Sequence, residues 1–155
     1  MTPSLQSELK QRKPFGSPEQ EASLSIARTA ALLDHATAEA LKPHGITPTQ
    51  YNALRILRGA EPEGLCRNEV RDRLVARVPD ATRLLDRLDD MGFVVRERQG
   101  DDRRFVRSRI TRAGLELLSS LDGVMQALHR RHLGHLGERK LRTLIDLLAE
   151  TRAPA

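Results

Sequence analysis

The sequence of 155 residues contains one cysteine, no tryptophan, one tyrosine and three phenylalanines. A single cysteine excludes an intrachain disulfide and a zinc site made from cysteines of one chain, and it suits a reducing compartment. No apolar run approaches the about 20 residues that a membrane helix needs, and the polar amino terminus lacks the apolar segment of a signal peptide. We therefore expect a cytoplasmic protein that does not contact membranes.

The remaining composition is that of an ordinary globular protein, with 39% hydrophobic and 30% charged residues. The length supports one core but is short for two independent domains. Few aromatic residues together with many Leu, Arg and Ala favour helices over sheets. We expect a single, mainly α domain.

Positive charge is concentrated in one third of the chain. The net charge is +5, and the segment 64–112 holds 13 Arg and no Lys against nine acidic residues, which is +4 of that total. Arginine makes bidentate contacts with phosphates and guanine edges, which lysine cannot match. This local excess is compatible with a polyanionic partner such as nucleic acid.

Capping signals and apolar spacing predict the order of the elements. Residues 1–16 have two prolines and few apolar side chains, so we expect a mobile arm. The expected helices run from Ser17 to before Pro43 and over 47–59, 68–74, 79–91, 111–134 and 137 onward. Two β-type runs, 93–98 and 105–110, flank a gap with the Gly and Asp signals of a hairpin loop.

Two short helices, a tight turn and a basic hairpin are typical of a winged helix-turn-helix, whose second helix enters the major groove of DNA. The helix at 79–91 is therefore the expected reader, and the hairpin at 93–110 is the expected wing. The apolar stripe of the reader must pack on the core, so its opposite face is left for base edges and phosphates. Arg83 is the best candidate for reading bases.

In the wing, Arg103 and Arg104 at the loop tip have the length and charge to enter a minor groove, where the negative potential attracts guanidinium groups. Asp102 could pair with an arginine and fix the shape of the tip. The expected DNA-binding residues are Arg77, Pro79, Thr82, Arg83, Asp86, Arg87, Asp102, Arg103, Arg104 and Arg107.

Three motifs in the segment 46–114 resemble those of the MarR family. Residues 46–51 (ITPTQY) resemble the family's L-T-x-x-Q-Y opening, and 82–88 (TRLLDRL) followed by 92–94 (GFV) resemble its reader helix and exit. Asp102-x-Arg104 followed by 110–114 (ITRAG) has the spacing of the wing motif, which is the most specific match. The third helix departs from the family pattern at Arg71 and at Cys66, which stands where Thr or Ser often caps the helix.

The resemblance implies a winged helix-turn-helix on a helical dimerisation platform built from the N- and C-terminal helices. Residues 17–155 would form one domain, in which 17–45 and 112–155 dimerise and 46–111 form the DNA-binding lobe. It implies a ligand-responsive homodimeric repressor on a pseudo-palindromic site of double-stranded DNA, without enzymatic activity or a cofactor. A small aromatic or phenolic effector would bind near His35, His44 and Tyr51.

Some residues admit other interpretations. His129, His132 and His135 recur at three-residue intervals, but arginines and Gly134 interrupt them and no acid or cysteine completes a metal site, so we expect no metal. Cys66 is a candidate redox thiol or a packing residue.

Two other classes of function are compatible with parts of the sequence. One is a metal-dependent enzyme that uses the histidines, and the other is a winged-helix module that binds protein.

Overall fold

The structure is a computed structural model and describes residues 2–98, 100–101 and 105–153. Its elements are α1 (Leu5–Glu8), α2 (Pro18–Leu41), η1 (Lys42–His44), α3 (Pro48–Gly59), α4 (Arg67–Arg73), α5 (Thr82–Asp90), β1 (Val94–Arg98), β2 (Val106–Ile110), α6 (Arg112–Leu133), η2 (Gly134–Leu136) and α7 (Gly137–Arg152). The predicted class, mainly α with a small hairpin, is confirmed.

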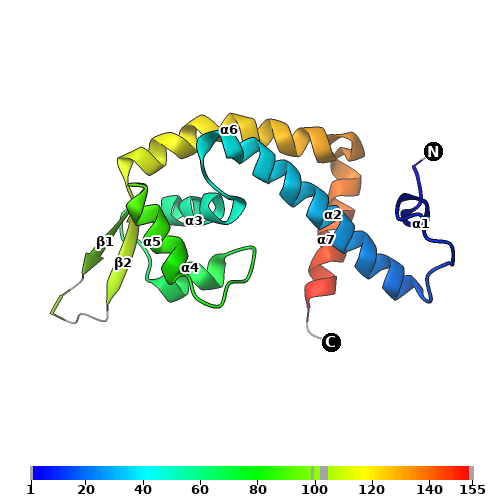
Figure 1. Ribbon diagram of the computed structural model, residues 1–155, viewed down its shortest axis with the longest axis horizontal. Helices are drawn as coiled ribbons and strands as arrows, with labels where there is room; N and C mark the ends of the chain where they lie inside the picture. The colour runs from blue at the N-terminus through cyan, green and yellow to red at the C-terminus, as the bar shows by residue number, and fades with distance from the viewer. Residues whose placement is uncertain (1, 99, 102–104, 154–155) are drawn as a thin grey trace.

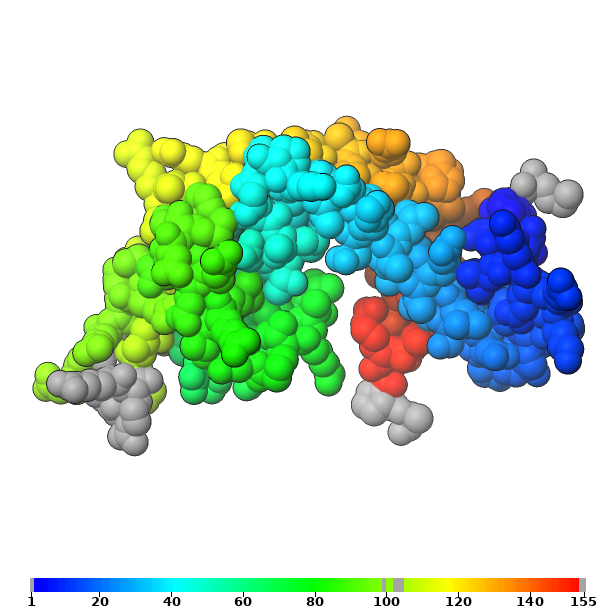
Figure 2. Space-filling model, viewed as in Figure 1, coloured from blue at the N-terminus to red at the C-terminus, as the bar shows by residue number. Residues whose placement is uncertain are grey.

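Figure 1 shows two parts of unlike shape. Helices α3, α4 and α5 and the hairpin of β1 and β2 form a bundled unit, the winged lobe (residues 46–111). The long helices α2, α6 and α7, the platform helices, extend away from it. Figure 2 shows a recess between the winged lobe and the C-terminal end of α7.

Side-chain caps set the helix starts that the sequence predicted. Ser17 caps α2, and Thr47 caps α3 in a capping box with Gln50, whose two hydrogen bonds measure 3.2 and 3.0 Å. Thr111 caps α6 by accepting a hydrogen bond from the Gly114 N–H at 3.2 Å. Each cap satisfies backbone donors that the first turn of a helix leaves without partners.

The reader helix begins later than predicted. Helix α5 starts at Thr82, so the prediction of a helix over 79–91 was wrong for its first three residues. The Asp80 carboxylate accepts hydrogen bonds from the Thr82 N–H (3.0 Å) and hydroxyl (2.8 Å), which turns the chain before the helix. Pro79 consequently lies in the preceding loop.

Two other segments also differ in detail from the prediction. Helix α4 spans Arg67–Arg73, one residue earlier than the predicted 68–74, because Leu74 is extended and the next N–H bonds to Asn52 at 2.9 Å. The segment predicted as a mobile arm contains the four-residue helix α1, capped by Ser4. Its mobility stays a prediction.

The buried core lies in the winged lobe and in the half of α6 that covers it. Helix α5 contributes Leu85 and Leu88, α3 contributes Leu54 and Leu57, and α6 contributes a stripe that ends at Met125. Helix α7 has no buried residue. The lobe therefore has a complete core, whereas the platform helices do not.

A bidentate ion pair joins the lobe to the platform. Both terminal nitrogens of Arg58 on α3 lie 3.0 Å from the carboxylate oxygens of Asp122 on α6. The hydrogen bond from Arg58 lowers the pKa of Asp122, so this carboxylate stays charged at lower pH than an isolated aspartate would. Because both side chains are partly exposed, we expect the pair to stabilise the fold by no more than about 1 kcal/mol.

Gly114 allows α6 to pack closely on the end of the hairpin. A Cβ at this position would lie 2.6 Å from the Phe93 carbonyl oxygen and 2.6 Å from Ile110 Cγ1. We expect Gly114→Ala to lower the free energy of unfolding by about 1–3 kcal/mol through overpacking. Urea unfolding followed by circular dichroism at a fixed protein concentration measures the change.

Gly123 on the same helix is the matched control, because a Cβ there meets nothing within 4 Å. We expect Gly123→Ala to raise the free energy of unfolding by about 0.5–1 kcal/mol, since alanine loses less backbone entropy in a helix. Equal stability of the two variants would contradict the close packing at Gly114.

Candidate nucleic-acid interface

Helix α5 exposes a basic surface because its apolar stripe is buried. Leu85 and Leu88 are 3% and 0% exposed, respectively, and they hold one side of the helix against the core. Arg83 and Arg87 are exposed, and because they lie four residues apart they share a face. The predicted reader therefore presents two guanidinium groups to solvent from a fixed helix.

Asp86 does not neutralise this basic face. Its carboxylate pairs with Arg96 on β1, and the Asp89 carboxylate lies 3.6 Å from the Nε of the same arginine. Within the described part of the chain, Arg83 makes no ion pair. The acidic residues of α5 thus tie the helix to the hairpin and leave Arg83 available.

The start of α5 is held by a small polar network that joins it to α4. The Arg67 guanidinium donates to the Thr82 hydroxyl at 3.3 Å, and that hydroxyl donates to Asp80. Hydrogen bonds from Thr82, first from its side chain and then from its backbone, lower the pKa of Asp80 and keep the carboxylate charged. Arg77 and Pro79 are exposed in the loop just before this network.

The two strands pair antiparallel, from Val94 opposite Ile110 to Arg98 opposite Val106. Side chains alternate along β2, since Ser108 and Ile110 are buried whereas Arg107 and Arg109 are partly exposed. Figure 1 shows the hairpin projecting from the winged lobe on the side away from α7.

The basic side of the hairpin is partly engaged within the protein. Arg107 donates to the Gly64 carbonyl at 2.9 Å, and Arg109 lies 3.3 Å from Glu61 and 3.5 Å from Glu97. The contacts to Gly64 and Glu61 hold β2 against the loop between α3 and α4. The predicted tip residues Asp102, Arg103 and Arg104 lie outside the described residues.

The same loop forms a backbone bridge to β2. The Leu65 N–H donates to the Ser108 carbonyl at 3.0 Å, and the Ser108 N–H donates to the Leu65 carbonyl at 2.7 Å. Gly64 precedes this bridge with φ +72°, where a Cβ would lie 2.6 Å from the Ser108 carbonyl oxygen. Glycine is required there by both backbone conformation and space.

Comparisons with known proteins agree with this geometry. A model of the MarR family matches residues 44–104, which include the reader and the first strand of the hairpin. The crystal structure of a MarR transcription factor from Planctomyces limnophilus is 41% identical, covers 88% of this chain and 98% of its own, and has a TM-score of 0.68. The chain belongs to the MarR family.

Two further proteins extend the comparison. The HTH-type transcriptional regulator YkoM from Bacillus subtilis (strain 168) is 29% identical over 115 residues, 71% of this chain and 73% of that protein. A mutant MarR from E. coli, solved in complex with operator DNA, is 27% identical with a TM-score of 0.76, over 84% of this chain and 93% of its own. This MarR-family chain is a transcription regulator of the DNA-binding, winged helix-turn-helix class, and not an enzyme.

The three residues predicted near an effector do not meet in one site. His35 on α2 and His44 in η1 are exposed. Tyr51 is 8% exposed and lines a separate cavity of about 360 Å³ between α3 and α6, where the Arg55 guanidinium lies 5.9 Å from its ring centroid. The effector role of these residues in this MarR-family protein stays a prediction.

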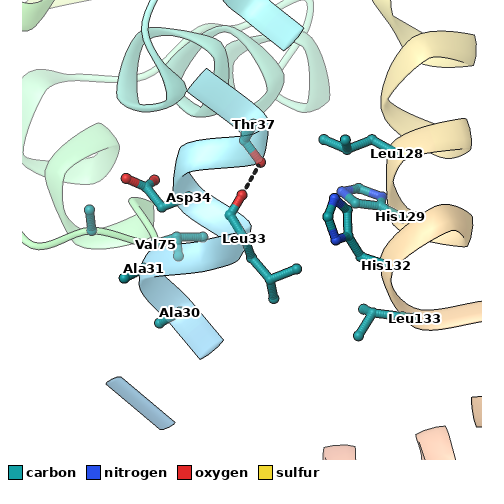
Figure 3. A pocket seen from close by; sticks show the side chains of 11 residues that line it. Ala30, Ala31, Leu33, Asp34, Thr37, Val75, Leu128, His129, His132 and Leu133 are labelled. Carbon is teal, nitrogen blue, oxygen red and sulfur yellow. Dashed lines mark hydrogen bonds between the residues drawn. The ribbon is translucent and has the colours of Figure 1, made fainter. Parts of the chain in front are cut away.

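Another cavity, here called the platform cavity, lies between α2, α6 and the loop before α5 and measures about 730 Å³. Figure 3 shows His129 and His132 pointing from α6 toward α2, while Asp34 points to the loop that carries Val75. The sequence indicated these histidines only as a possible metal motif. Among the described residues, no group of three or more His, Cys, Asp or Glu side chains could hold a metal ion.

Cys66 occupies the N-cap position of α4, as the family pattern suggested. Its backbone N–H donates to the Glu69 carboxylate at 2.8 Å, and this bond is the main cause of a lowered Glu69 pKa. The thiol forms no disulfide and is half-buried.

A search of the described helices for a membrane span found none with the necessary length and hydropathy.

Sequence reasoning missed Arg67, Asp80 and Arg96 at the interface. Each acts across a turn or between elements, and helical spacing carries no signal for such contacts. Arg67 also lay just outside the predicted third helix. The excess of arginine in the segment was readable from the sequence. The sequence did not show which of these arginines form ion pairs within the protein and which remain exposed.

The close packing at Gly64 can be tested by substitution in this MarR-family protein. We expect Gly64→Ala to force the loop away from Ser108 and to weaken DNA binding by displacing the wing, while the helical content is retained. Gly59→Ala is the control, because Gly59 ends α3 and has nothing within 4 Å of a built Cβ. Fluorescence anisotropy with labelled duplex DNA measures the affinities. Equal binding by both variants would contradict the role assigned to Gly64.

Proposed function

We propose that the protein is a homodimeric repressor that binds a pseudo-palindromic site on double-stranded DNA through α5 and the wing. The observation that carries this proposal is the outward basic face of α5 beside the hairpin. In a winged helix-turn-helix, the N-terminal part of the reader contacts base edges in the major groove. Arg83, in the first turn of α5, is the residue that we assign to base reading.

The surrounding residues suit contacts with the DNA backbone. Arg87 lies one turn along α5, and Arg77 and Pro79 lie in the loop before it. Thr82 lies beside them, and its hydroxyl, which donates to Asp80 in the free protein, would turn to a phosphate in the complex. We assign these residues to phosphates, because phosphate contacts position a reader without specifying sequence.

At the wing, we assign Arg103 and Arg104 to an adjacent minor groove. Asp102 is assigned to shaping the tip by pairing with an arginine. Arg107 and Asp86 take supporting roles, since Arg107 bonds to the Gly64 carbonyl and Asp86 pairs with Arg96. The wing would thus bind DNA with its tip and bind the lobe with its base.

Selection of binders from a random duplex pool tests the proposal directly. We expect an enriched inverted repeat with half-sites about one helical turn apart, and an affinity that falls steeply with salt. Weak binding without a motif at low salt would refute the proposal and would favour a winged-helix module that binds protein.

The selected site allows the assigned arginines to be separated. We expect Arg83→Ala to reduce discrimination at one base position by about 1–3 kcal/mol, and Arg104→Ala to weaken binding to all sequences and reduce the salt slope by about one. Arg142→Ala, an exposed substitution on α7, should change neither quantity. Unchanged binding by both interface variants would refute the assigned contacts.

The dimeric state is supported by the uncovered surface of the platform helices. An apolar groove of about 830 Å³, the platform groove, lies between α2, α6 and α7, and Ile26, Leu133 and Leu144 are among its lining residues. Ile145 in the same groove is 56% exposed. Burial of apolar surface at about 25 cal/mol per Å² favours a second copy covering this groove.

Ile145→Glu tests this arrangement, since it places a charge in the platform groove. We expect the variant to sediment as a monomer at micromolar concentration and to lose cooperative binding to the two half-sites. Asp146→Lys changes the charge of the neighbouring exposed residue and should leave the dimer intact. A dimeric Ile145→Glu protein would show that the groove is not the interface.

Ligand response is the final element of the proposal. The platform cavity lies between the platform and the loop that leads directly into α5, so a bound molecule there would bias the position of the reader. Its walls combine apolar side chains with His129 and His132, which suits a small aromatic or phenolic effector. We place the protein in the cytoplasm, where such a regulator meets its DNA.

A further inference from the structure

The loop before the reader carries an acidic residue within a surface that is otherwise basic. Asp80 is exposed and lies two residues before Thr82, the first residue of α5. Asp86 and Asp89 on α5 are engaged by Arg96. Among the residues that the structure describes, Asp80 has no partner in an ion pair. Its negative charge therefore stands beside the reader without a neutralising arginine, where it repels DNA phosphates.

The fold needs the hydrogen bonds of Asp80 more than it needs the charge. A single oxygen, Oδ1, accepts hydrogen bonds from the Thr82 N–H at 3.0 Å and from the Thr82 hydroxyl at 2.8 Å. The amide oxygen of an asparagine could accept the same two bonds, and asparagine caps helices about as well as aspartate does. The helix dipole also favours a carboxylate, but this effect is weak at an exposed position. The turn before α5 thus accounts for the side-chain oxygen and not for its charge.

Arg67 lies near Asp80, at the start of α4. Its guanidinium donates to the Thr82 hydroxyl at 3.3 Å, and it is exposed and forms no ion pair with another described residue. After the two hydrogen bonds from Thr82, the charges of Arg67 and Arg71 are further causes of the lowered pKa of Asp80. As the first residue of α4, Arg67 puts a positive charge at the positive end of the helix dipole, which is unfavourable. A role outside the helix explains this arginine better than a role within it.

A phosphate has the charge and the acceptor oxygens that suit these donors. Charge-assisted hydrogen bonds from arginine and from hydroxyl groups are the usual contacts of a phosphate, and anions bind favourably at the start of a helix. We propose that Asp80 is an internal competitor of the DNA backbone. In the free protein it holds the Thr82 hydroxyl that a phosphate takes in the complex, and it repels that phosphate as it approaches Thr82 and Arg67. This inference rests on the proposed function, which assigns Thr82 to a phosphate.

The competition lowers the affinity for every DNA sequence by the same factor. All sequences carry the same phosphates, so a group that acts on phosphates has no base preference. Arg83 offsets the loss at an operator, where it reads bases, but nothing offsets the loss on other DNA, which is bound through phosphates alone. Asp80 thereby limits the time that the protein spends on the large excess of non-operator DNA.

The Asp80→Asn variant separates the charge from the turn. We expect it to keep the helical content and to bind both the selected operator and random-sequence duplexes about three- to tenfold more tightly at low salt. The gain should shrink as the salt concentration rises, because it is electrostatic. Asp146→Asn is the matched control, since it removes the same charge from an exposed residue of α7 and should leave both affinities unchanged. Fluorescence anisotropy with labelled duplexes measures all of these affinities.

The sign of the effect distinguishes a competitor from a purely structural residue. Damage to the start of α5 would weaken DNA binding, whereas removal of a competitor strengthens it. Asp80→Ser gives a second measurement if asparagine perturbs the turn, because serine also caps helices and carries no charge. It should bind DNA more tightly than the wild-type protein as well. Equal or lower affinity of both neutral variants would overturn the inference, and so would a gain confined to the operator.

Operator duplexes in which single phosphates are replaced by neutral methylphosphonates locate the competition. At one position of each half-site, the gain from Asp80→Asn should disappear, because no charge is left there for the carboxylate to repel. Arg67→Ala should weaken binding to the unmodified duplex several-fold and should have little effect on the duplex that is neutral at that same position. A gain that persists with every duplex would show that Asp80 acts only through the overall charge of the protein, and it would refute competition for one phosphate.

Failure of the inference can be told apart from failure of the proposed function. An operator that the wild-type protein and Asp80→Asn bind with equal affinity overturns the inference and leaves the proposed function standing. If neither protein binds any duplex at low salt, the proposed function fails and the inference fails with it.

Discussion

The two backbone hydrogen bonds between Leu65 and Ser108 are the constraint on which the interface depends. They join the hairpin to the loop that enters α4, and Gly64 makes the approach possible. The Arg96 pair with Asp86 then fixes α5 to the other strand. Wing and reader are consequently positioned by the same hairpin, so a displacement of either strand alters both surfaces together.

The sequence predicted the fold well where local rules operate. Caps such as Ser17 and Thr111 and the apolar stripe of α5 determine helix starts and faces without help from distant residues. The start of α5 was predicted three residues early, because Pro79 is favourable at a first helical position whereas Asp80 forms a competing turn with Thr82. Proline preference is a weak signal compared with two short-range hydrogen bonds.

The candidate site was less predictable, because contacts between elements decide which of its arginines are exposed. Arg83 and Arg87 followed from helical periodicity alone. Helical periodicity did not predict which acidic residue pairs with which arginine. Asp86 follows Arg83 by three residues in the sequence, but it pairs with Arg96 on β1. Likewise, Cys66 was readable as a capping residue, but the cavity that it lines together with Arg96 and Ser108 depends on the placement of the hairpin.

The length of helix α6 has a mechanical consequence, because the helix belongs to both the lobe and the platform. Its first half is buried in the lobe core through residues such as Leu118, and its last turn lines the platform groove through Leu133. A helix of 22 residues is about 33 Å long at 1.5 Å per residue. A tilt of about 5° at one end therefore moves the other end by about 3 Å, close to the spacing of successive nucleotides along a DNA strand. As a rigid element shared by the platform and the lobe, α6 would transmit a small rotation at the platform to the lobe as a shift of about one base step.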